Sequence, residues 1–267
     1  MHSGFLVSVL LVHYWGVEGR GGAVEPVIPK DVLRIIGGAD AKHDTQPYLV
    51  ALFENAYFIC GGSIVDDRWI LTAAHCVVKF DPFGTKKGIS ILAGTNHLYQ
   101  GGKRYVVDRV LPFEGYNGSL LNDIALLRLK TSVVYEKRIQ KIKPAKENVP
   151  INASITLVGW GRVESGKKSD KTQTLNVKNI GLKRCREKYI SLPKLSNSIY
   201  DGNICTFIEN GRSICNGDSG SPVIWNGMQV GVVSWSEKCA LEYPDVHTSV
   251  SYFYDWIQQT MAANSKS

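Results

Sequence analysis

The sequence lacks several features that would place it in other classes of protein. It has no internal repeat and no low-complexity tract, and its six cysteines form no CxxC pair of the kind that zinc sites use. No Asp or Glu occurs between Pro82 and Val107, so this stretch offers no carboxylates for calcium. No nucleic-acid-binding motif is present. We therefore expect no metal, no cofactor and no nucleic-acid partner.

The first 34 residues are predicted to be removed from the mature protein. Residues 1–19 contain an apolar run at residues 5–12 followed by small residues, which is typical of a signal peptide. No Lys or Arg precedes this run, so a membrane anchor is the alternative, but the run is too short to span a bilayer. Residues 20–34 contain two prolines and no core-sized apolar run, and are predicted to be a flexible pro-segment. We expect a secreted, extracellular protein with a mature domain at residues 35–267 and no membrane association.

The chain is basic, with 31 Lys and Arg against 24 Asp and Glu and a formal net charge of +7. The basic residues are concentrated at residues 137–146, 167–171 and 183–188. Such runs are usually solvated surface, and this is the interpretation we favour. Attraction to anionic partners such as sulfated glycans is the alternative.

Short apolar runs separated by turn residues predict an all-β protein after residue 35. Asn226-Gly227 predicts a tight hairpin, because both turn positions need positive φ. Val250, Phe253, Ile257 and Met261 fall at helical spacing and predict a C-terminal helix at about 250–263, with a second short helix possible around residues 183–190. The pattern alone leaves open a sandwich, one large barrel or two small barrels. The predicted strands are residues 48–53, 58–65, 89–93, 105–111, 124–129, 155–160, 175–180, 223–225 and 228–235.

Three separate segments carry residues suited to nucleophilic catalysis. Ser219 lies in the glycine-flanked segment GDSGSP, His75 in the segment TAAHC, and Asp123 in the segment NDIAL. Serine is a poor nucleophile unless a base takes its proton, and an imidazole oriented by a carboxylate supplies that base. The order His, Asp, Ser along the chain is one of the three known orders for such a triad.

On these motifs the chain resembles the chymotrypsin-like serine proteases of the trypsin family, over nearly its whole length from Ile35 onward, and looks closest to arthropod chymotrypsin-like members. The resemblance implies two antiparallel six-stranded β-barrels with the active site between them and a C-terminal helix. His75 and Asp123 would come from the first barrel and Ser219 from the second. It also implies that Ser234 hydrogen-bonds Asp123.

The resemblance assigns further roles around the nucleophile. The backbone N–H groups of Gly217 and Ser219 would form the oxyanion hole. Cleavage after Arg34 by a trypsin-like protease would free the α-amino group of Ile35, whose cation would pair with a buried Asp218. Before this cleavage the oxyanion hole and the specificity pocket would be poorly formed, so the protein would be made as a zymogen.

Six cysteines in a secreted chain predict three disulfides, but the sequence alone allows fifteen pairings. The resemblance implies the pairs Cys60–Cys76, Cys185–Cys205 and Cys215–Cys239. Two N-glycosylation sequons, at Asn117 and Asn152, predict a glycoprotein, although either site can remain unused.

The resemblance also locates a specificity pocket. Ser213 would lie at its base with Ile214 beside it, Asp245 would lie near the base, and Ser234, Trp235 and Ser236 would form one wall. Trypsin-like enzymes carry an aspartate in the place of Ser213, so a neutral serine favours apolar P1 residues such as Leu, Met, Phe or Tyr. The alternative is that Asp245 reaches into the pocket and accepts Lys or Arg. We favour a shielded Asp245, because a bare charge in an apolar pocket is costly.

These observations predict a serine endopeptidase that acts through an acyl-enzyme. A non-catalytic protease homologue that acts as a binding protein is the rival, but it would be expected to lack one of His75, Asp123 and Ser219. An esterase with the same triad is a third possibility, and the Arg34-Ile35 junction argues against it. We expect polypeptide substrates, protein protease inhibitors and a monomeric enzyme.

Overall fold

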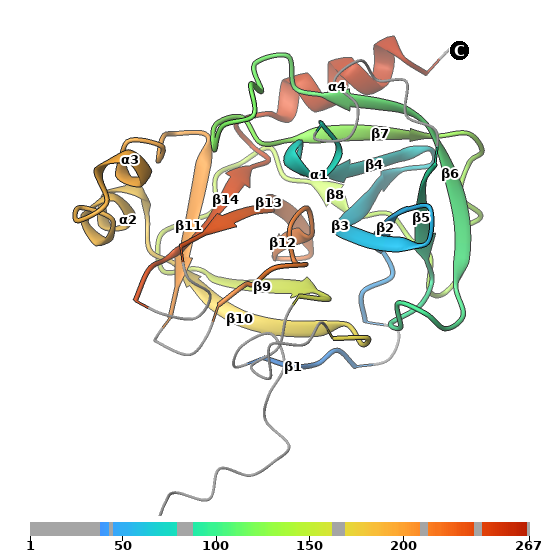
Figure 1. Ribbon diagram of the computed structural model, residues 1–267, viewed down its shortest axis with the longest axis horizontal. Coiled ribbons are helices and arrows are strands. Elements are labelled where there is room, and N and C mark those ends of the chain that lie inside the picture. Colours follow the sequence, from blue (N-terminus) through green and yellow to red (C-terminus); the bar gives the residue numbers. More distant parts are fainter. Residues whose placement is uncertain are drawn as a thin grey trace, which may run out of the picture. The chain divides into compact units, whose positions relative to one another are not determined.

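The computed structural model describes residues 38–42, 45–78, 88–161, 169–208, 213–237 and 242–265 (Figure 1). The predicted signal peptide, the pro-segment, the Arg34-Ile35 junction and Cys239 lie outside the described residues. Within the described ranges, no helix is long and apolar enough to cross a membrane.

The first half of the domain is a closed antiparallel barrel with the strand order β2-β3-β4-β7-β6-β5, drawn from blue to green in Figure 1. Every residue of β7 is buried. In β6 buried residues are interspersed with exposed ones, so only some side chains of β6 face the core. Arg128 is the charged exception within β7, and it donates two hydrogen bonds of 2.9 and 2.8 Å to Asp108. The strands are β2 (Leu49–Glu54), β3 (Tyr57–Asp66), β4 (Trp69–Thr72), β5 (Ile89–Ala93), β6 (Lys103–Pro112) and β7 (Ala125–Leu129).

The second half forms another six-stranded ring, because β9 pairs with both β10 and β12 and so closes the order β9-β10-β11-β14-β13-β12. A short β1 (Ala39–Asp40) adds to β10, and β8 (Lys143–Pro144) runs parallel to β13. The two-barrel fold is therefore confirmed. The ring strands are β9 (Ser154–Gly159), β10 (Gln173–Asn179), β11 (Asn203–Phe207), β12 (Pro222–Trp225), β13 (Met228–Ser236) and β14 (Asp245–Ser249).

The predicted hairpin and helices are also present. Asn226 and Gly227 connect β12 and β13 with φ values of 48° and 73°. The C-terminal helix α4 (Tyr254–Ala263) begins after a turn at residues 251–253 and packs Ile257 into the core of the first barrel (Figure 1). The short helix α2 (Leu182–Lys188) matches the second prediction, whereas α1 (His75–Val78) and α3 (Pro193–Ser196) have only four residues each and were not predicted.

Two of the three predicted disulfides are confirmed, Cys60–Cys76 and Cys185–Cys205. Cys215 is also disulfide-bonded, and its predicted partner Cys239 lies outside the described residues.

An apolar cluster joins the two barrels. The ring of Phe58 on β3 meets that of Trp160, which follows β9, edge to face at a centroid distance of 6.1 Å. Phe53 of β2 and Ile224 of β12 belong to the same cluster. We call these four residues the junction cluster, and it holds together the two halves that supply the active site.

Candidate active site

His75 and Asp123 lie at neighbouring ends of two paired strands. His75 begins α1 directly after β4, and Asp123 precedes β7, and these strands pair with Thr72 opposite Ala125. The backbone N–H of His75 donates to Asp123 Oδ1 at 2.9 Å, and His75 Nδ1 lies 2.7 Å from Asp123 Oδ2. The carboxylate thus holds both the backbone and the ring of the histidine. This leaves Nε2 directed away from Asp123, as a general base requires.

The Asp123 carboxylate receives donors from both barrels. Ser234 of β13 donates its hydroxyl to Asp123 Oδ2 at 2.5 Å, in addition to the two donors from His75. Burial acts to raise the pKa of Asp123, but the hydrogen bonds and charge of His75 and the Ser234 hydroxyl outweigh it and hold the pKa below its usual value. The Asp123 carboxyl group is therefore held as an anion beside the His75 ring.

Ser219 lies in a loop that packs against the segment leading to His75. The carbonyl oxygen of Ser219 accepts a 2.8 Å hydrogen bond from the N–H of Gly61, which follows the disulfide-bonded Cys60. A Cβ atom on the next residue, Gly220, would lie 2.3 Å from Oγ1 of Thr72. Only glycine at 220 allows this close approach of the Ser219 loop to the end of β4.

Gly217 has a φ of +110°, a conformation that side chains disfavour. A Cβ atom there would also lie 3.1 Å from the Cα of Gly161. The loop that carries the N–H groups of residues 217 and 219 therefore depends on glycine at this position.

Asp218 points into the protein and not toward the cleft. Its carboxylate is 1% exposed and accepts hydrogen bonds from the N–H groups of Gly161 at 2.8 Å and Cys215 at 3.0 Å. A Cβ atom on Gly159 or Gly161 would lie within 2.2 Å of an Asp218 oxygen, so these glycines create the space for it. Burial raises the pKa of Asp218 to about 6, against the lowering effect of the two N–H donors. A cation brought to this carboxylate would therefore be strongly favoured.

A pocket of about 190 Å³ opens beside Ser219. Asp245 and Ser213 are not among its lining residues and are both buried. Asp245 lies opposite Ser236 in the pairing of β14 with β13, directly behind the pocket wall. The lining residues are Ile214, Cys215, Asn216, Ser219, Val233, Ser234, Trp235 and Ser236.

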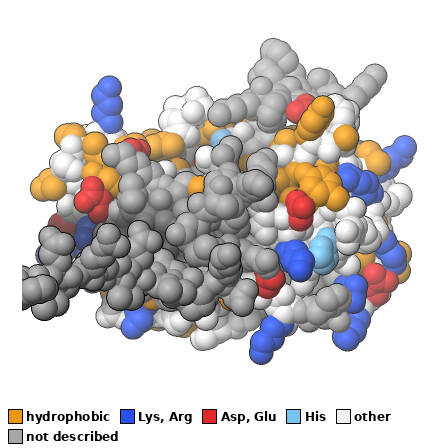
Figure 2. Space-filling view, turned by 60° about the horizontal axis from the view of Figure 1, so that its bottom comes forward, with side chains coloured by type: hydrophobic (Ala, Val, Ile, Leu, Met, Phe, Trp, Pro, Cys, Tyr) orange, Lys and Arg blue, Asp and Glu red, His pale blue; other side chains and the backbone are white. Residues whose placement is uncertain are grey.

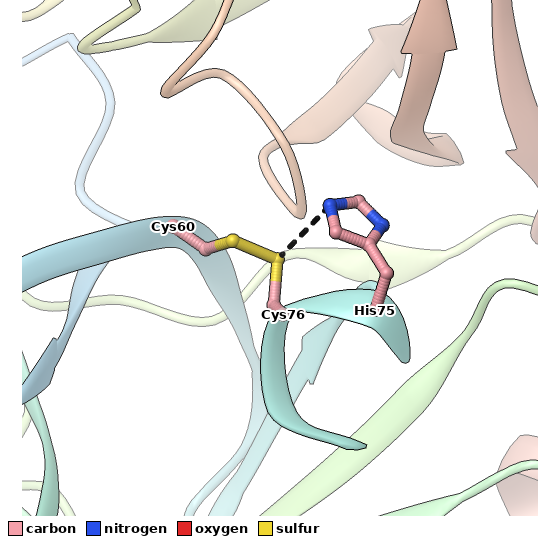
Figure 3. Close-up of side chains that lie close together, drawn as sticks. All are labelled: Cys60, His75 and Cys76. Atoms are coloured by element: carbon pink, nitrogen blue, oxygen red, sulfur yellow. Dashed lines mark hydrogen bonds between the residues drawn. A yellow bond between two sulfur atoms is a disulfide. The ribbon is translucent and has the colours of Figure 1, made fainter. Parts of the chain in front are cut away.

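Figure 3 shows the ring of His75 beside the Cys60–Cys76 disulfide, with Nε2 3.7 Å from Cys76 Sγ. One ligand-type atom from each of these three residues lies within 4.8 Å of the others. Both sulfur atoms are joined to each other, however, so they are not thiolate ligands for a metal. The disulfide instead anchors the start of α1 to β3.

The other predicted surface features are less distinctive. Asn117 and Asn152 are both exposed, as glycosylation requires. Lys141 in the basic stretch at 137–146 is paired with Asp66 at 2.6 Å. In Figure 2, Lys and Arg side chains on the visible face are scattered among Asp and Glu, and do not form one continuous basic patch. The solvated interpretation of the basic stretches stays a prediction.

Two residues from the second barrel that the sequence did not point to also hold the Asp123 segment. The Tyr200 hydroxyl donates to Asn122 Oδ1 at 2.9 Å and accepts from the N–H of Asn122 at 3.0 Å. Asn122 has a φ of +55°, so these bonds stabilise an unusual conformation just before Asp123. The Thr248 hydroxyl donates to the carbonyl oxygen of Asp123 at 2.8 Å. No local motif marks these contacts, because the partners are 78 and 125 residues apart.

Tyr200→Phe is expected to lower kcat by roughly three- to tenfold with little change in KM, because about 0.7–1.4 kcal/mol of hydrogen bonding that orients Asp123 is lost. Tyr252→Phe is the matched control, since its ring contacts that of Tyr200 edge-on at 5.8 Å. Steady-state kinetics on one peptide substrate would measure both. Equal kcat values for Tyr200→Phe and the unmodified protein would show that Tyr200 does not position the site.

Comparison with known proteins identifies relatives of this chain. The family model described as Trypsin matches residues 35–257. The chain is 35% identical to chymotrypsin-2 of Vespa crabro over 84% of this chain and 99% of that protein. It is 32% identical to trypsin epsilon of Drosophila erecta over 96% of each. Among solved structures, neuropsin, a serine protease expressed in the limbic system of mouse brain, matches with a TM-score of 0.74 and 30% identity over 84% of this chain and 98% of that one.

Proposed function

The chain belongs to the trypsin family and is a chymotrypsin-like serine endopeptidase, and from this premise we propose that Ser219, His75 and Asp123 hydrolyse the peptide bond. The observation that carries the proposal is the hydrogen-bonded unit of His75, Asp123 and Ser234, next to the segment on which the Ser219 loop packs. Polypeptides are the substrates, and protein protease inhibitors are the expected partners.

The proposed reaction proceeds in two stages. Ser219 Oγ attacks the scissile carbonyl carbon while its proton passes to His75 Nε2, and the protonated histidine then gives that proton to the departing amine. Water, deprotonated by the same nitrogen, next attacks the acyl-enzyme ester, and the protonated histidine returns that proton to Ser219 Oγ as the C–O bond breaks and the acid product leaves. Asp123 stays ionised throughout, because its pKa is held low, and it stabilises each imidazolium as it forms.

Negative charge develops on the substrate oxygen in both stages. We assign its stabilisation to the N–H groups of Gly217 and Ser219, and one such donor is worth about 3–4 kcal/mol in known proteases. The positive φ of Gly217 supports this role, since it turns the local backbone in a way that a side chain would oppose.

We further propose that the enzyme is a secreted, monomeric zymogen that a trypsin-like protease cleaves after Arg34. The sequence of residues 1–34 supports secretion and processing. The buried Asp218, with a raised pKa and two backbone donors, supports a role as acceptor for the new α-amino group of Ile35.

The proposed specificity is for apolar P1 residues. Supporting it, the Asp245 carboxyl group is 2% exposed and is engaged by Ser213 and the N–H of Ile214, away from the pocket lining. Among the described residues that line the pocket, which include Ile214, Val233 and Trp235, none carries a charged side chain. A cationic P1 side chain would there lose its hydration without a direct partner.

The test is cleavage of matched peptides that differ only at P1, by the protein processed at Arg34. At pH 6 we expect kcat/KM for Leu or Phe to exceed that for Arg or Lys by at least about tenfold, since one unpaired buried charge costs more than 1.4 kcal/mol. Preference for Arg or Lys would assign the Lys/Arg alternative through Asp245. Absence of cleavage of every peptide would contradict the proposed protease function itself.

A further inference from the structure

The Ser213 hydroxyl behind the pocket wall has one proton and two close acceptors. Its Oγ lies 2.8 Å from the carbonyl oxygen of Ile214 and 2.5 Å from Asp245 Oδ1. A serine hydroxyl can donate one hydrogen bond only. One of these two short contacts therefore needs a proton from the other side, and a carbonyl oxygen carries none.

A proton on Asp245 satisfies every contact. Asp245 Oδ1–H then donates to Ser213 Oγ, Ser213 donates to the Ile214 carbonyl oxygen, and Asp245 Oδ2 accepts the 3.2 Å hydrogen bond from the Ile214 N–H. An ionised Asp245 would instead leave two oxygen lone pairs facing each other in one of the short contacts. Because all of these atoms are buried, such an unmade hydrogen bond is costly.

The other two buried carboxylates near the site differ in this respect. Asp123 faces three N–H or O–H donors, and Asp218 faces two backbone N–H groups. None of those donors also has a carbonyl oxygen as a second acceptor at a comparable distance. The Ser213 hydroxyl does, because it also faces the carbonyl oxygen of Ile214. The hydrogen bonds thus call for carboxylate anions at Asp123 and Asp218, and for a carboxylic acid at Asp245.

We propose that Asp245 is a neutral acid that donates its proton to Ser213 below neutral pH, and that its ionisation as the pH rises through neutrality turns the specificity pocket from apolar toward Lys and Arg. The proposal rests on the proposed protease function and adds the protonation state that decides P1 choice. Asp245 acts through the electrostatic potential of the pocket and is a specificity-determining residue, not a catalytic one.

The surroundings of Asp245 support this state. Burial raises the pKa of Asp245 to about 7, and the negative charge of Asp218 adds to the increase, although the Ser213 hydroxyl, the Ile214 N–H and the Ser236 hydroxyl oppose it. Among the described residues, the other titratable groups around it are Tyr189 and His247. Burial raises the pKa of Tyr189 and lowers that of His247 to about 3, so both are uncharged near neutral pH. Neither supplies a cation to hold Asp245 ionised.

A direct test uses the full chain carrying Ser219→Ala, with aspartate labelled by ¹³C at the carboxyl carbon, titrated by NMR from pH 5 to 9. Adding Asp245→Asn identifies the resonance of Asp245. Asparagine can reproduce the neutral acid, because its amide donates to Ser213 Oγ and accepts from Ile214. We expect the identified resonance to titrate with a midpoint near 7. An Asp245 resonance that remains ionised over the whole range would overturn the proposal.

The specificity consequence is tested on protein processed at Arg34, as the ratio of kcat/KM for an Arg to a Leu P1 peptide between pH 6 and 9. Any effect of pH on the catalytic steps that the two substrates share cancels in this ratio. We expect the ratio to rise at least about tenfold, to become independent of pH in Asp245→Asn, and to keep its rise in the control Asp201→Asn, an exposed carboxylate. A flat ratio in the unmodified enzyme would overturn the role in specificity. If no peptide is cleaved, the protease function fails while the NMR titration still decides the protonation state.

Discussion

Ser219→Ala is expected to lower kcat/KM for peptide hydrolysis by roughly five to six orders of magnitude while leaving the fold intact. Loss of the hydroxyl removes the attacking atom, so His75 and Asp123 have no nucleophile to activate. The two barrels do not depend on this side chain, because the contacts of residue 219 with the neighbouring barrel run through its backbone carbonyl oxygen. A small rate above that of water remains from binding and the oxyanion hole.

The control is Ser198→Ala, which alters a partly exposed serine whose hydroxyl donates to the carbonyl oxygen of Lys194. It should retain full activity. A serine-directed phosphonate should label the unmodified protein at Ser219 and leave Ser219→Ala unlabelled, as peptide mapping by mass spectrometry would show. Substantial hydrolysis by Ser219→Ala, with a normal circular dichroism spectrum, would refute the assignment of the nucleophile.

Asp218→Asn is expected to reduce the activity of the processed enzyme by roughly 10²- to 10⁴-fold. Breaking a buried ion pair costs about 3–5 kcal/mol, and each 1.4 kcal/mol is a factor of ten. In the chain described here Asp218 has two N–H donors and a pKa raised to about 6, so the α-amino cation of Ile35 would be its missing partner. Asparagine keeps at most one of the two backbone hydrogen bonds, because its amide nitrogen cannot accept from an N–H, and it cannot pair with that cation.

Cleavage and pairing can be separated by a second variant. Arg34→Gln should resist a trypsin-like activator and stay inactive, whereas Asp218→Asn should be cleaved normally and begin at Ile35 on N-terminal sequencing. Both should be secreted in amounts similar to the unmodified chain. If the uncleaved protein is as active as the cleaved one, the proposed switch between Ile35 and Asp218 is wrong.

Local patterns in the sequence predicted the elements well where burial is regular. The apolar run before Leu129 became the fully buried β7, and Asn226-Gly227 became a tight turn because it supplies positive φ at both positions. The closure of each barrel followed from the family resemblance alone. Alternation along β9 indicates which face is buried, but it carries no information on which two strands are its neighbours.

The arrangement of the site was predictable only in part, because local patterns carry no information on which distant segments meet. The motifs identified His75 and Asp123, since both follow from residue type and local context. Tyr200 could not be identified, because its hydrogen bonds to Asn122 depend on how one barrel docks on the other. The direction of the Asp245 carboxyl group likewise depends on the position of Ser213, 32 residues earlier.

The integrity of the active site depends on the junction cluster as well as on each barrel. Asp123 is held by His75 from its own barrel and by Ser234 and Thr248 from the other, so separation of the barrels removes two of its partners at once. The packing of Phe58 on Trp160 opposes that separation. We therefore expect catalytic competence to depend on this internal interface, as it would in a dimer whose two subunits are covalently tethered, so that separation of the barrels would end activity even if both sheets stayed intact.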